Sequence, residues 1–358
     1  FINKEIFFPH SIGLLYSTFT SFCGFEINHG EYKLMGLASY GSPRYVDKIW
    51  KLVKVNRDGS FQLNMDYFSF QHSTTRMFSS KFTNLFGQPR NVMYTSNIDQ
   101  IYADLAASVQ FVLEQILFGI ATKLHEETGM TNLCLAGGVA LNSVANGKMI
   151  RNTPFDEIYI QPASGDGGGA LGAAFYAYHV LLNKPRHFLM EHAYWGEEYT
   201  PSEIVKDLKQ KGIPFTEIHS EDQLVDMSVN FLKDQKVIGW FQGRFEYGPR
   251  ALGNRSILAD PRTPTMKDRV NSKVKFREPF RPFAPSVLSD YLGDCFSVPE
   301  AHHDYPLRFM QYVVEVNDAF KDRIPSVVHV DGTSRPHLVK ETDNKRYYDL
   351  IKGFNDSE

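Results

Sequence analysis

The sequence has little cysteine, no long apolar run and no leader-like start. Its 358 residues include three cysteines, Cys23, Cys134 and Cys295, which lie far apart and form no CxxC pair. This spacing argues against a disulfide framework and a thiolate zinc site, and it favours a reducing cytoplasm. No uninterrupted run of about 18 apolar residues is present to span a bilayer, and no basic segment followed by an apolar one opens the chain. We therefore expect a cytoplasmic protein without a membrane partner.

A large excess of either charge is also missing. The net charge is −3, with 38 Lys and Arg against 41 Asp and Glu. This balance argues against a general nucleic-acid binder. The chain has no GxSxG, Walker A or HExxH motif, so those nucleophile, phosphate-loop and zinc sites are not expected. Any transfer chemistry would then rely on positioning and charge stabilisation.

The chain does have enough apolar residues for two packed domains, since 42% of its 358 residues are hydrophobic and 14% are aromatic. Buried strands are predicted at 133–136 and 156–161. Each strand runs into a glycine turn and then into a helix, over 139–150 and 170–182 respectively. Strand, glycine turn and helix, repeated twice, predict an α/β domain.

Three other segments of this half show clear patterns. Apolar positions at helical spacing predict a helix over 9–24, which would end at Gly24. The glycine-flanked segment 30–41 is predicted as a loop. The longest periodic segment begins at Asp99 and predicts a core-facing helix. Its apolar positions repeat every three or four residues: Leu105, Val109, Val112, Ile116, Ile120 and Leu124.

The pattern becomes less regular in the second half. We place a first domain at 1–186, a linker at 187–201, where Pro185 and Pro201 bracket a polar mixture, and a second domain at 202–358. The second domain is predicted to be α+β. Its helices are expected at 202–211, with Ser202 as N-cap, and at 221–233, and its strands at 237–241, 307–316 and 326–330.

An arginine-rich turn is the strongest chemical signal. Residues 242–256 place Arg244, Arg250 and Arg255 in a turn rich in Gly and Pro, directly after an apolar run. Guanidinium groups match phosphate and carboxylate oxygens bidentately. From Arg244 to Arg281 ten residues are Lys or Arg and four are Asp or Glu, an excess of six positive charges. The sequence therefore predicts a site for a small polyanion.

A second glycine-rich loop spans residues 165–172. An acid among glycines between a strand and a helix, here Asp166, can hold a metal while backbone N–H groups face phosphate oxygens. Gly167 to Gly172 also fit the dinucleotide pattern GxGxxG, with Glu191 as the distant acid. A simple tight turn is the third interpretation.

Two other polar segments have both functional and structural interpretations. Asn142 and Asn146 lie four residues apart on one face of the helix after Gly137 and Gly138. Their carboxamides would bind the polar edges of a ligand such as a nucleoside, or they would be capping or solvent-exposed residues. The turn 329–335 ends in Arg335. This arginine would add a fourth guanidinium to the anion site, or the turn would lie on the surface.

Five segments together resemble the NodU/CmcH family of O-carbamoyltransferases, in the same order and over nearly the whole chain. The GPRALG and RPFAP elements are the most specific of them. The segments are 31–41, 135–142, 164–174, 247–256 and 280–285.

The resemblance implies a fold and a reaction. The first domain would be the later part of an actin-like (ASKHA) ATPase fold, and the second would be an incomplete YrdC-like carbamoyltransferase C-terminal domain. The family uses carbamoyl phosphate and ATP to form a carbamoyl adenylate. It then passes the carbamoyl group to a hydroxyl of a sugar or natural product.

The resemblance also implies roles for individual residues. Arg250, Lys275 and Arg281 would be catalytic and, with Arg335, would bind phosphates. Asp166 would be a ligand of a divalent metal, iron or magnesium. Gly137, Gly138 and Asn142 would line the nucleotide pocket. The neighbouring candidates for substrate or nucleotide binding are Gly167, Gly168, Arg244 and Arg255.

The chain also departs from the family pattern. Members carry an HxxxH metal motif and an early acid upstream, and an NTSFN-like segment downstream, and none of these occurs in the 358 residues. We therefore expect an internal fragment with weak or no activity of its own, and a possible homo-oligomer. The rival hypotheses are a nucleotide- or phosphate-binding module without transfer chemistry and an NAD(P)-dependent oxidoreductase.

Overall fold

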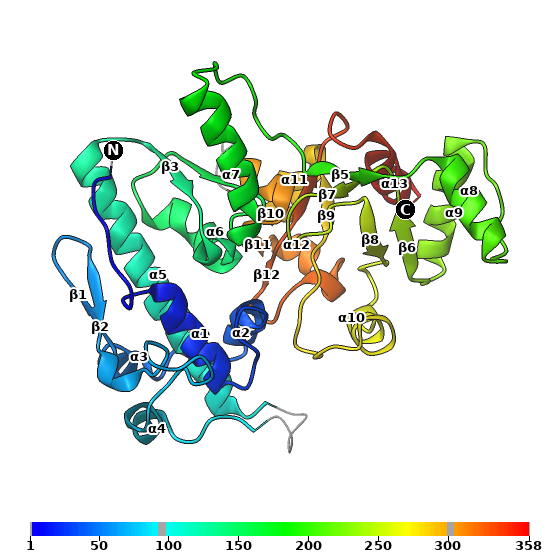
Figure 1. The fold of residues 1–358 in the computed structure, drawn as a ribbon. Coiled ribbons are helices and arrows are strands. Elements are labelled where there is room, and N and C mark those ends of the chain that lie inside the picture. The colour runs from blue at the N-terminus through cyan, green and yellow to red at the C-terminus, as the bar shows by residue number, and fades with distance from the viewer. Residues whose placement is uncertain (1, 92–97, 299–303, 358) are drawn as a thin grey trace.

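The computed structural model describes residues 2–91, 98–298 and 304–357 (Figure 1). Its first region is mainly helical. The long helix α5 (Gln100–Thr128) runs through this region, with shorter helices packed around it. The other elements are α1 (Ile12–Phe22), α2 (Glu31–Ala38), α3 (Val46–Ile49), α4 (Ser80–Phe86) and the antiparallel hairpin of β1 (Val53–Val55) and β2 (Phe61–Leu63).

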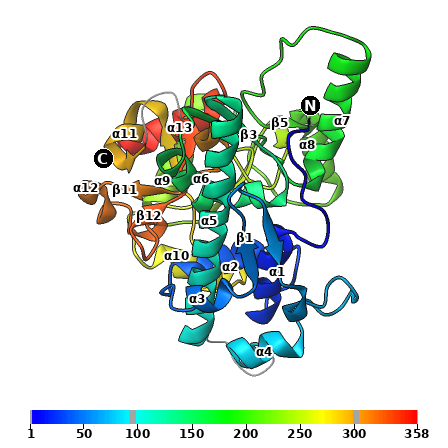
Figure 2. The same cartoon turned by 90° about the vertical axis from the view of Figure 1, so that its left-hand side faces the viewer.

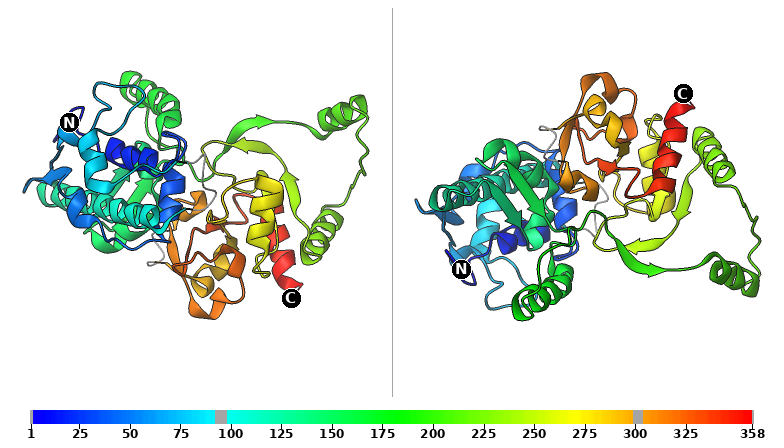
Figure 3. Two further views of the ribbon diagram at one scale, coloured as in Figure 1. Left: turned by 90° about the horizontal axis from the view of Figure 1, so that it is seen from below. Right: turned by 90° about the horizontal axis from the view of Figure 1, so that it is seen from above.

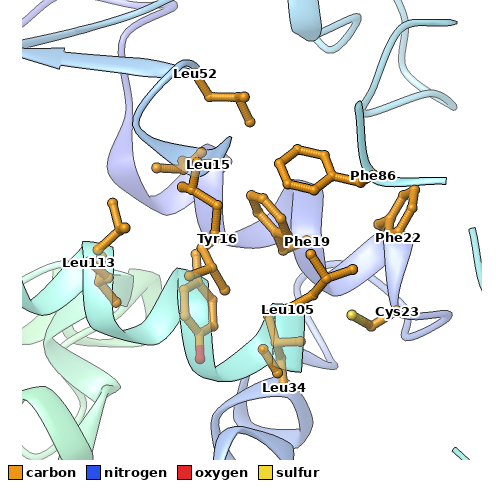
Figure 4. Close-up of a cluster of buried hydrophobic side chains, with 14 of the residues drawn as sticks. Leu15, Tyr16, Phe19, Phe22, Cys23, Leu34, Leu52, Phe86, Leu105 and Leu113 are labelled. Carbon is orange, nitrogen blue, oxygen red and sulfur yellow. The ribbon is translucent and has the colours of Figure 1, made fainter. Parts of the chain in front are cut away.

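Aromatic side chains fill the core of this region. Phe19 and Phe22 of α1 meet Phe82 and Phe86 of α4, with ring centroids 5.2 to 6.4 Å apart in edge-on arrangements. Leu105 of α5 closes the cluster from the other side (Figure 4). These pairs bury much apolar area and add aromatic contact energy. The helix predicted over 9–24 is thus confirmed as α1.

The helix predicted from Asp99 is also confirmed. Asp99 is the N-cap of α5, and Gly129 adopts the left-handed conformation at φ 64° that ends the helix. By length and composition, α5 is a helix able to cross a membrane, with a mean hydropathy of 1.5 over its most apolar window. In the structure, 61% of that window is buried, as expected for a core helix.

The predicted loop over 30–41 is wrong, because residues 31–38 form α2. The Glu31 carboxylate accepts hydrogen bonds from the backbone N–H groups of Asn28 (3.0 Å) and Gly30 (3.2 Å), which fixes the helix start. Leu34 and Leu37 are buried against the core. The flanking glycines hid this short amphipathic helix.

The repeated strand, glycine turn and helix is confirmed. Strands β3 (Asn132–Leu135) and β4 (Glu157–Ile160) pair in parallel, and α6 (Ser143–Asn152) connects them. After β4 the chain forms α7 (Gly169–Phe175) and a π-helical turn (176–181), which project from the rest of the molecule (Figures 1 and 2). The fold is therefore mixed α/β; the ASKHA-like assignment stays a prediction.

A second core joins the two halves of the chain. Apolar residues of β3, β4 and α6 pack with residues from 287–338, among them Tyr312 and Val314. The Val313 N–H donates to Ser143 O at 2.9 Å. A Cβ placed on Gly147 would lie 2.0 Å from Val313 O, so α6 needs glycine there. The first region is therefore anchored directly onto the second.

The second region consists of short strands with helices around them. Strand β11 (Val314–Val316) pairs with β10 (Phe296–Ser297) and β12 (Thr333–Ser334), and β13 (His337–Val339) pairs in parallel with β9 (Ser286–Leu288). The strand predicted over 326–330 is wrong, because 325–327 form a 3₁₀ turn that begins with a proline. Within 307–316, only 314–316 are a strand.

The arginine-rich turn belongs to two strand pairs. Strand β6 (Ile238–Phe241) pairs with β8 (Arg255–Leu258), and β5 (Tyr194–Glu198) pairs with β7 (Arg244–Glu246). The segment predicted as a linker thus contains a strand, while the domain boundaries themselves stay a prediction.

Helices complete this region. The helix predicted over 202–211 is α8, but its N-cap is Thr200, which forms a capping box with Glu203. Helices α8 and α9 lie at the end of the molecule far from α5 (Figure 3). The helices are α8 (Pro201–Gln210), α9 (Glu221–Lys233), α10 (Met266–Val270), α11 (Leu292–Cys295), α12 (Asp318–Lys321) and α13 (Lys345–Asp356).

One buried histidine, His337, makes the stability of this region depend on pH. His337 is 3% exposed and stacks on Tyr347 of α13 with ring centroids 6.1 Å apart. Its Nδ1 lies 3.2 Å from Ser286 Oγ. Burial lowers the pKa of His337 to about 3, from 6.5. The folded state therefore holds this ring neutral where the unfolded chain would protonate it.

We predict that acidification destabilises the fold through His337. Below pH 6.5 the unfolded state takes up a proton that the folded state does not bind until about pH 3. The free energy of unfolding should fall by about 1.4 kcal/mol per pH unit in that window from this group alone. Urea unfolding between pH 7 and 4 should show a shallower fall for His337→Gln than for the control His219→Gln, an exposed histidine. Equal slopes would contradict the assignment.

Candidate functional site

The arginine-rich turn is folded around one carboxylate. Glu246 Oε1 accepts hydrogen bonds from the backbone N–H groups of Leu252 (2.8 Å), Asn254 (2.9 Å) and Arg255 (3.1 Å). Gly248 and Gly253 adopt φ values of 123° and 99°, which favour glycine. The turn is thus a built structure that holds Arg250 in a defined place.

Two of the predicted arginines have other partners. The Arg255 guanidinium lies over the rings of Phe241 (3.5 Å) and Phe245 (4.1 Å) and donates to the carbonyl oxygens of Asn254 and Gly243. Arg244 Nε lies 3.5 Å from Glu198 Oε2. Both side chains therefore hold β6, β7 and their neighbours together, and the structure does not bring them to the anion site.

Four other arginines converge on one place. Arg335, after β12, lies close enough to Arg250, Arg277 and Arg281 for their charges to act on it. Burial and these three charges lower the pKa of Arg335 well below its usual range. Burial, with the charges of Arg277 and Arg281, also lowers the pKa of Lys275. The predicted grouping of Arg250, Lys275, Arg281 and Arg335 thus agrees with the structure; their roles stay a proposal. We call these residues, with Arg277, the cationic cluster.

The cluster has few anionic partners of its own. Within the described residues, Arg250 and Arg335 make no ion pair or side-chain hydrogen bond, and the Arg335 Nε is buried without an acceptor. Burial lowers the pKa of Arg250 to about 10. Among the described residues, the carboxylate that pairs with the cluster is that of Glu278, whose Oε2 lies 3.5 Å from Arg281 Nη1. Partly buried, unpaired guanidinium groups destabilise the folded state unless an anion binds them.

Arg277 was missed by the sequence interpretation. Its Nε donates to Asn271 Oδ1 at 2.7 Å, and its guanidinium lies 4.4 Å from the centre of the Phe283 ring. Burial and the charge of Arg281 lower its pKa to about 10. The sequence signal for Arg277 was its place in the basic segment before Arg281. That segment also contains exposed lysines such as Lys273, so position alone could not single out Arg277.

The second glycine-rich loop touches the arginine-rich turn. Tyr247 Oη donates to Gly167 O at 2.6 Å, and the Gly137 N–H donates to Ser164 O at 2.7 Å. The two glycine segments and the arginine-rich turn are therefore linked. Beside them lies an open cavity of about 360 Å³ with an apolar lining: Ala170, Leu171, Phe175, Phe188, Met190, Trp195 and Tyr247.

The carboxamides of the first glycine segment are engaged within the protein. Asn142 Oδ1 caps α6 by accepting from the Ala145 N–H at 3.0 Å, and its Nδ2 donates to Gln110 Oε1 at 2.9 Å. Asn146 Nδ2 donates to Ala140 O at 2.8 Å. The capping interpretation therefore describes Asn142. A Cβ placed on Gly137 or Gly138 would meet nothing within 4 Å.

Asp166 is exposed and begins a 3₁₀ turn (Asp166–Gly168) that runs directly into α7. Among the described residues, no group of three or more His, Cys, Asp or Glu side chains is arranged to hold a metal ion. Asp166 would thus be one ligand of a site that these residues do not complete.

Comparison with known proteins identifies the family. The family model described as "Carbamoyltransferase N-terminus" matches residues 1–175, and the model "Carbamoyltransferase C-terminus" matches residues 229–358. The chain belongs to the carbamoyltransferase family. It is 38% identical to Nodulation protein NolNO of Sinorhizobium fredii over 97% of this chain, and 36% identical to Nodulation protein NolO of Bradyrhizobium diazoefficiens over 99%.

An uncharacterised protein of Synechocystis is 43% identical over 98% of this chain. The chain spans 60%, 49% and 62% of the lengths of the Synechocystis, NolNO and NolO proteins. Both carbamoyltransferase models match in their expected order, which does not favour the oxidoreductase alternative based on Gly167 to Gly172.

We predict that Glu246 is needed for the shape of the turn. Glu246→Ala would leave three backbone N–H groups without their acceptor, and we expect a loss of about 2 kcal/mol in the free energy of unfolding. Urea unfolding measures this loss. Glu217→Ala, at an exposed position, is the matched control. Equal stability of the two variants would show that the carboxylate does not organise the turn.

Proposed function

We propose that the cationic cluster binds the phosphate groups of carbamoyl phosphate and ATP in an O-carbamoyltransferase. The supporting observation is a pair of half-buried arginines, Arg250 and Arg335, which have no anionic partner among the described residues, and the Arg335 Nε is buried without an acceptor. Phosphate oxygens would supply the missing charge and acceptors. Fixed cations would also stabilise negative charge that develops as phosphate departs and a carbamoyl adenylate forms.

The second half of the reaction is proposed for the glycine loops. There the carbamoyl group would pass to a hydroxyl of a sugar or natural product. The hydrogen bond from Tyr247 to Gly167 supports this arrangement, because it links the arginine-rich turn to the loop that carries Asp166. Asp166 would be one ligand of a divalent metal, iron or magnesium. Since the described residues do not complete that site, we derive no step through the metal.

The proposed carbamoyl phosphate site predicts that this chain alone binds inorganic phosphate. Inorganic phosphate should raise its melting temperature, because an anion relieves repulsion in the cluster. Arg335→Met should abolish the phosphate effect and raise the phosphate-free stability by about 1 kcal/mol, since it removes an unpaired, half-buried charge. Thermal melts with and without phosphate test both. Arg186→Met, at an exposed site, should behave like the wild type. A phosphate shift retained in Arg335→Met would contradict the assignment.

Turnover distinguishes a transferase from a binding module. In the full-length parent, Arg250→Ala and Lys275→Ala should each lower kcat/KM for carbamoyl phosphate by about 100-fold or more, because each removes a fixed charge from the reacting phosphate. Release of phosphate measures the effect, and Arg186→Ala is the control. Wild-type turnover in either cluster variant would refute the proposal. A parent that binds phosphate without turnover would instead be the binding module.

A further inference from the structure

Helix α2 belongs to a motif, 31–41, to which the proposed function gives no role. In space it lies on the side of the first region that faces α10 and β12 (Figures 1 and 2). A Cβ placed on Gly36 would lie 3.7 Å from Pro282 Cδ, so the helix approaches the loop that carries Arg281 closely. The first region therefore forms one wall of the cationic cluster.

Several contacts join this wall to the cluster. The guanidinium carbon of Arg281 lies 4.7 Å from the centre of the Tyr32 ring, a cation–π contact. Lys33 Nζ donates to Glu278 Oε1 at 2.6 Å. Just beyond the helix, Tyr40 Oη donates to Phe280 O at 3.3 Å. All three contacts fall on residues 278–281.

Glu278 is central to the electrostatics. It lies between two cations, with Lys33 at 2.6 Å and Arg281 at 3.5 Å. Burial alone would raise the pKa of Glu278, but the hydrogen bond and charge of Lys33, with the charge of Arg281, lower it below the usual value. The Glu278 carboxylate is therefore ionised, and the shorter of its two ion pairs is the one with Lys33 of α2. Without Lys33, its remaining cationic partner would be Arg281.

We propose that Lys33 is a positioning residue of the anion site. It holds the Glu278 carboxylate, and this keeps the Arg281 guanidinium available for a phosphate group. The site is then completed by a helix that lies more than 200 residues away in sequence from the cluster. This inference rests on the proposed function, because it assumes that the cluster binds an anion.

The test compares phosphate binding across variants of the chain, with inorganic phosphate titrated calorimetrically. Lys33→Met should weaken phosphate binding by about tenfold, because the freed Glu278 competes for Arg281. Glu278→Gln should bind at least as tightly as the wild type. The double variant should bind like Glu278→Gln, since the competitor is gone. Lys33→Arg should restore binding, and Lys54→Met on β1 is the matched control.

The outcomes separate the two proposals. A wild-type chain that does not bind phosphate would overturn the proposed function, and this inference with it. If the wild type binds and Arg335→Met does not, but Lys33→Met binds normally, only the role of Lys33 is overturned. That role is also overturned if the double variant binds as weakly as Lys33→Met, because Lys33 would then act without Glu278. Thermal melts of each variant exclude a loss of binding through unfolding.

Discussion

Mutual repulsion among like charges is the constraint on which this structure depends. Burial and the charges of Arg250, Arg277 and Arg281 lower the pKa of Arg335, and burial and the charge of Arg281 lower that of Arg277. Among the described residues, one carboxylate, that of Glu278, forms an ion pair with the cluster. Such a group does not assemble by its own interactions, so the scaffold must supply the energy that holds it. Hydrogen bonds to backbone, aromatic faces and strand pairing provide that support from several directions, and a bound anion would supply the rest.

The support comes from both halves of the chain. The turn of Arg250 is held by Glu246, the Arg335 segment by β12, and the Arg281 loop by α2. Packing of Tyr312 and Val314 against β3, β4 and α6 fixes the two regions relative to each other. A cluster built from segments so far apart in sequence has a geometry that depends on the whole core.

The sequence predicted local elements better than it predicted partners. Helical periodicity was sufficient to predict α5, and short apolar runs ahead of glycine turns were sufficient to predict β3 and β4. The β-branched run at 326–330 was misleading, because 325–327 form a 3₁₀ turn. The charge excess over 244–281 predicted an anion site that included Arg250 and Arg281, and the turn at 329–335 offered Arg335 as an addition. The structure places these three arginines near one another, and their roles stay a proposal. The charge excess could not distinguish these arginines from Arg255, whose guanidinium lies over an aromatic ring and donates to a carbonyl oxygen. Such distinctions depend on long-range contacts, which no local pattern carries.

The shared core also has a consequence for proteolysis. Residues 211–217 lie exposed between α8 and α9, outside both regions that match the carbamoyltransferase models. A cut there would leave the packing of β3, β4 and α6 against β11 untouched. The two pieces would therefore stay associated in solution. The fold would survive although the chain had been cut.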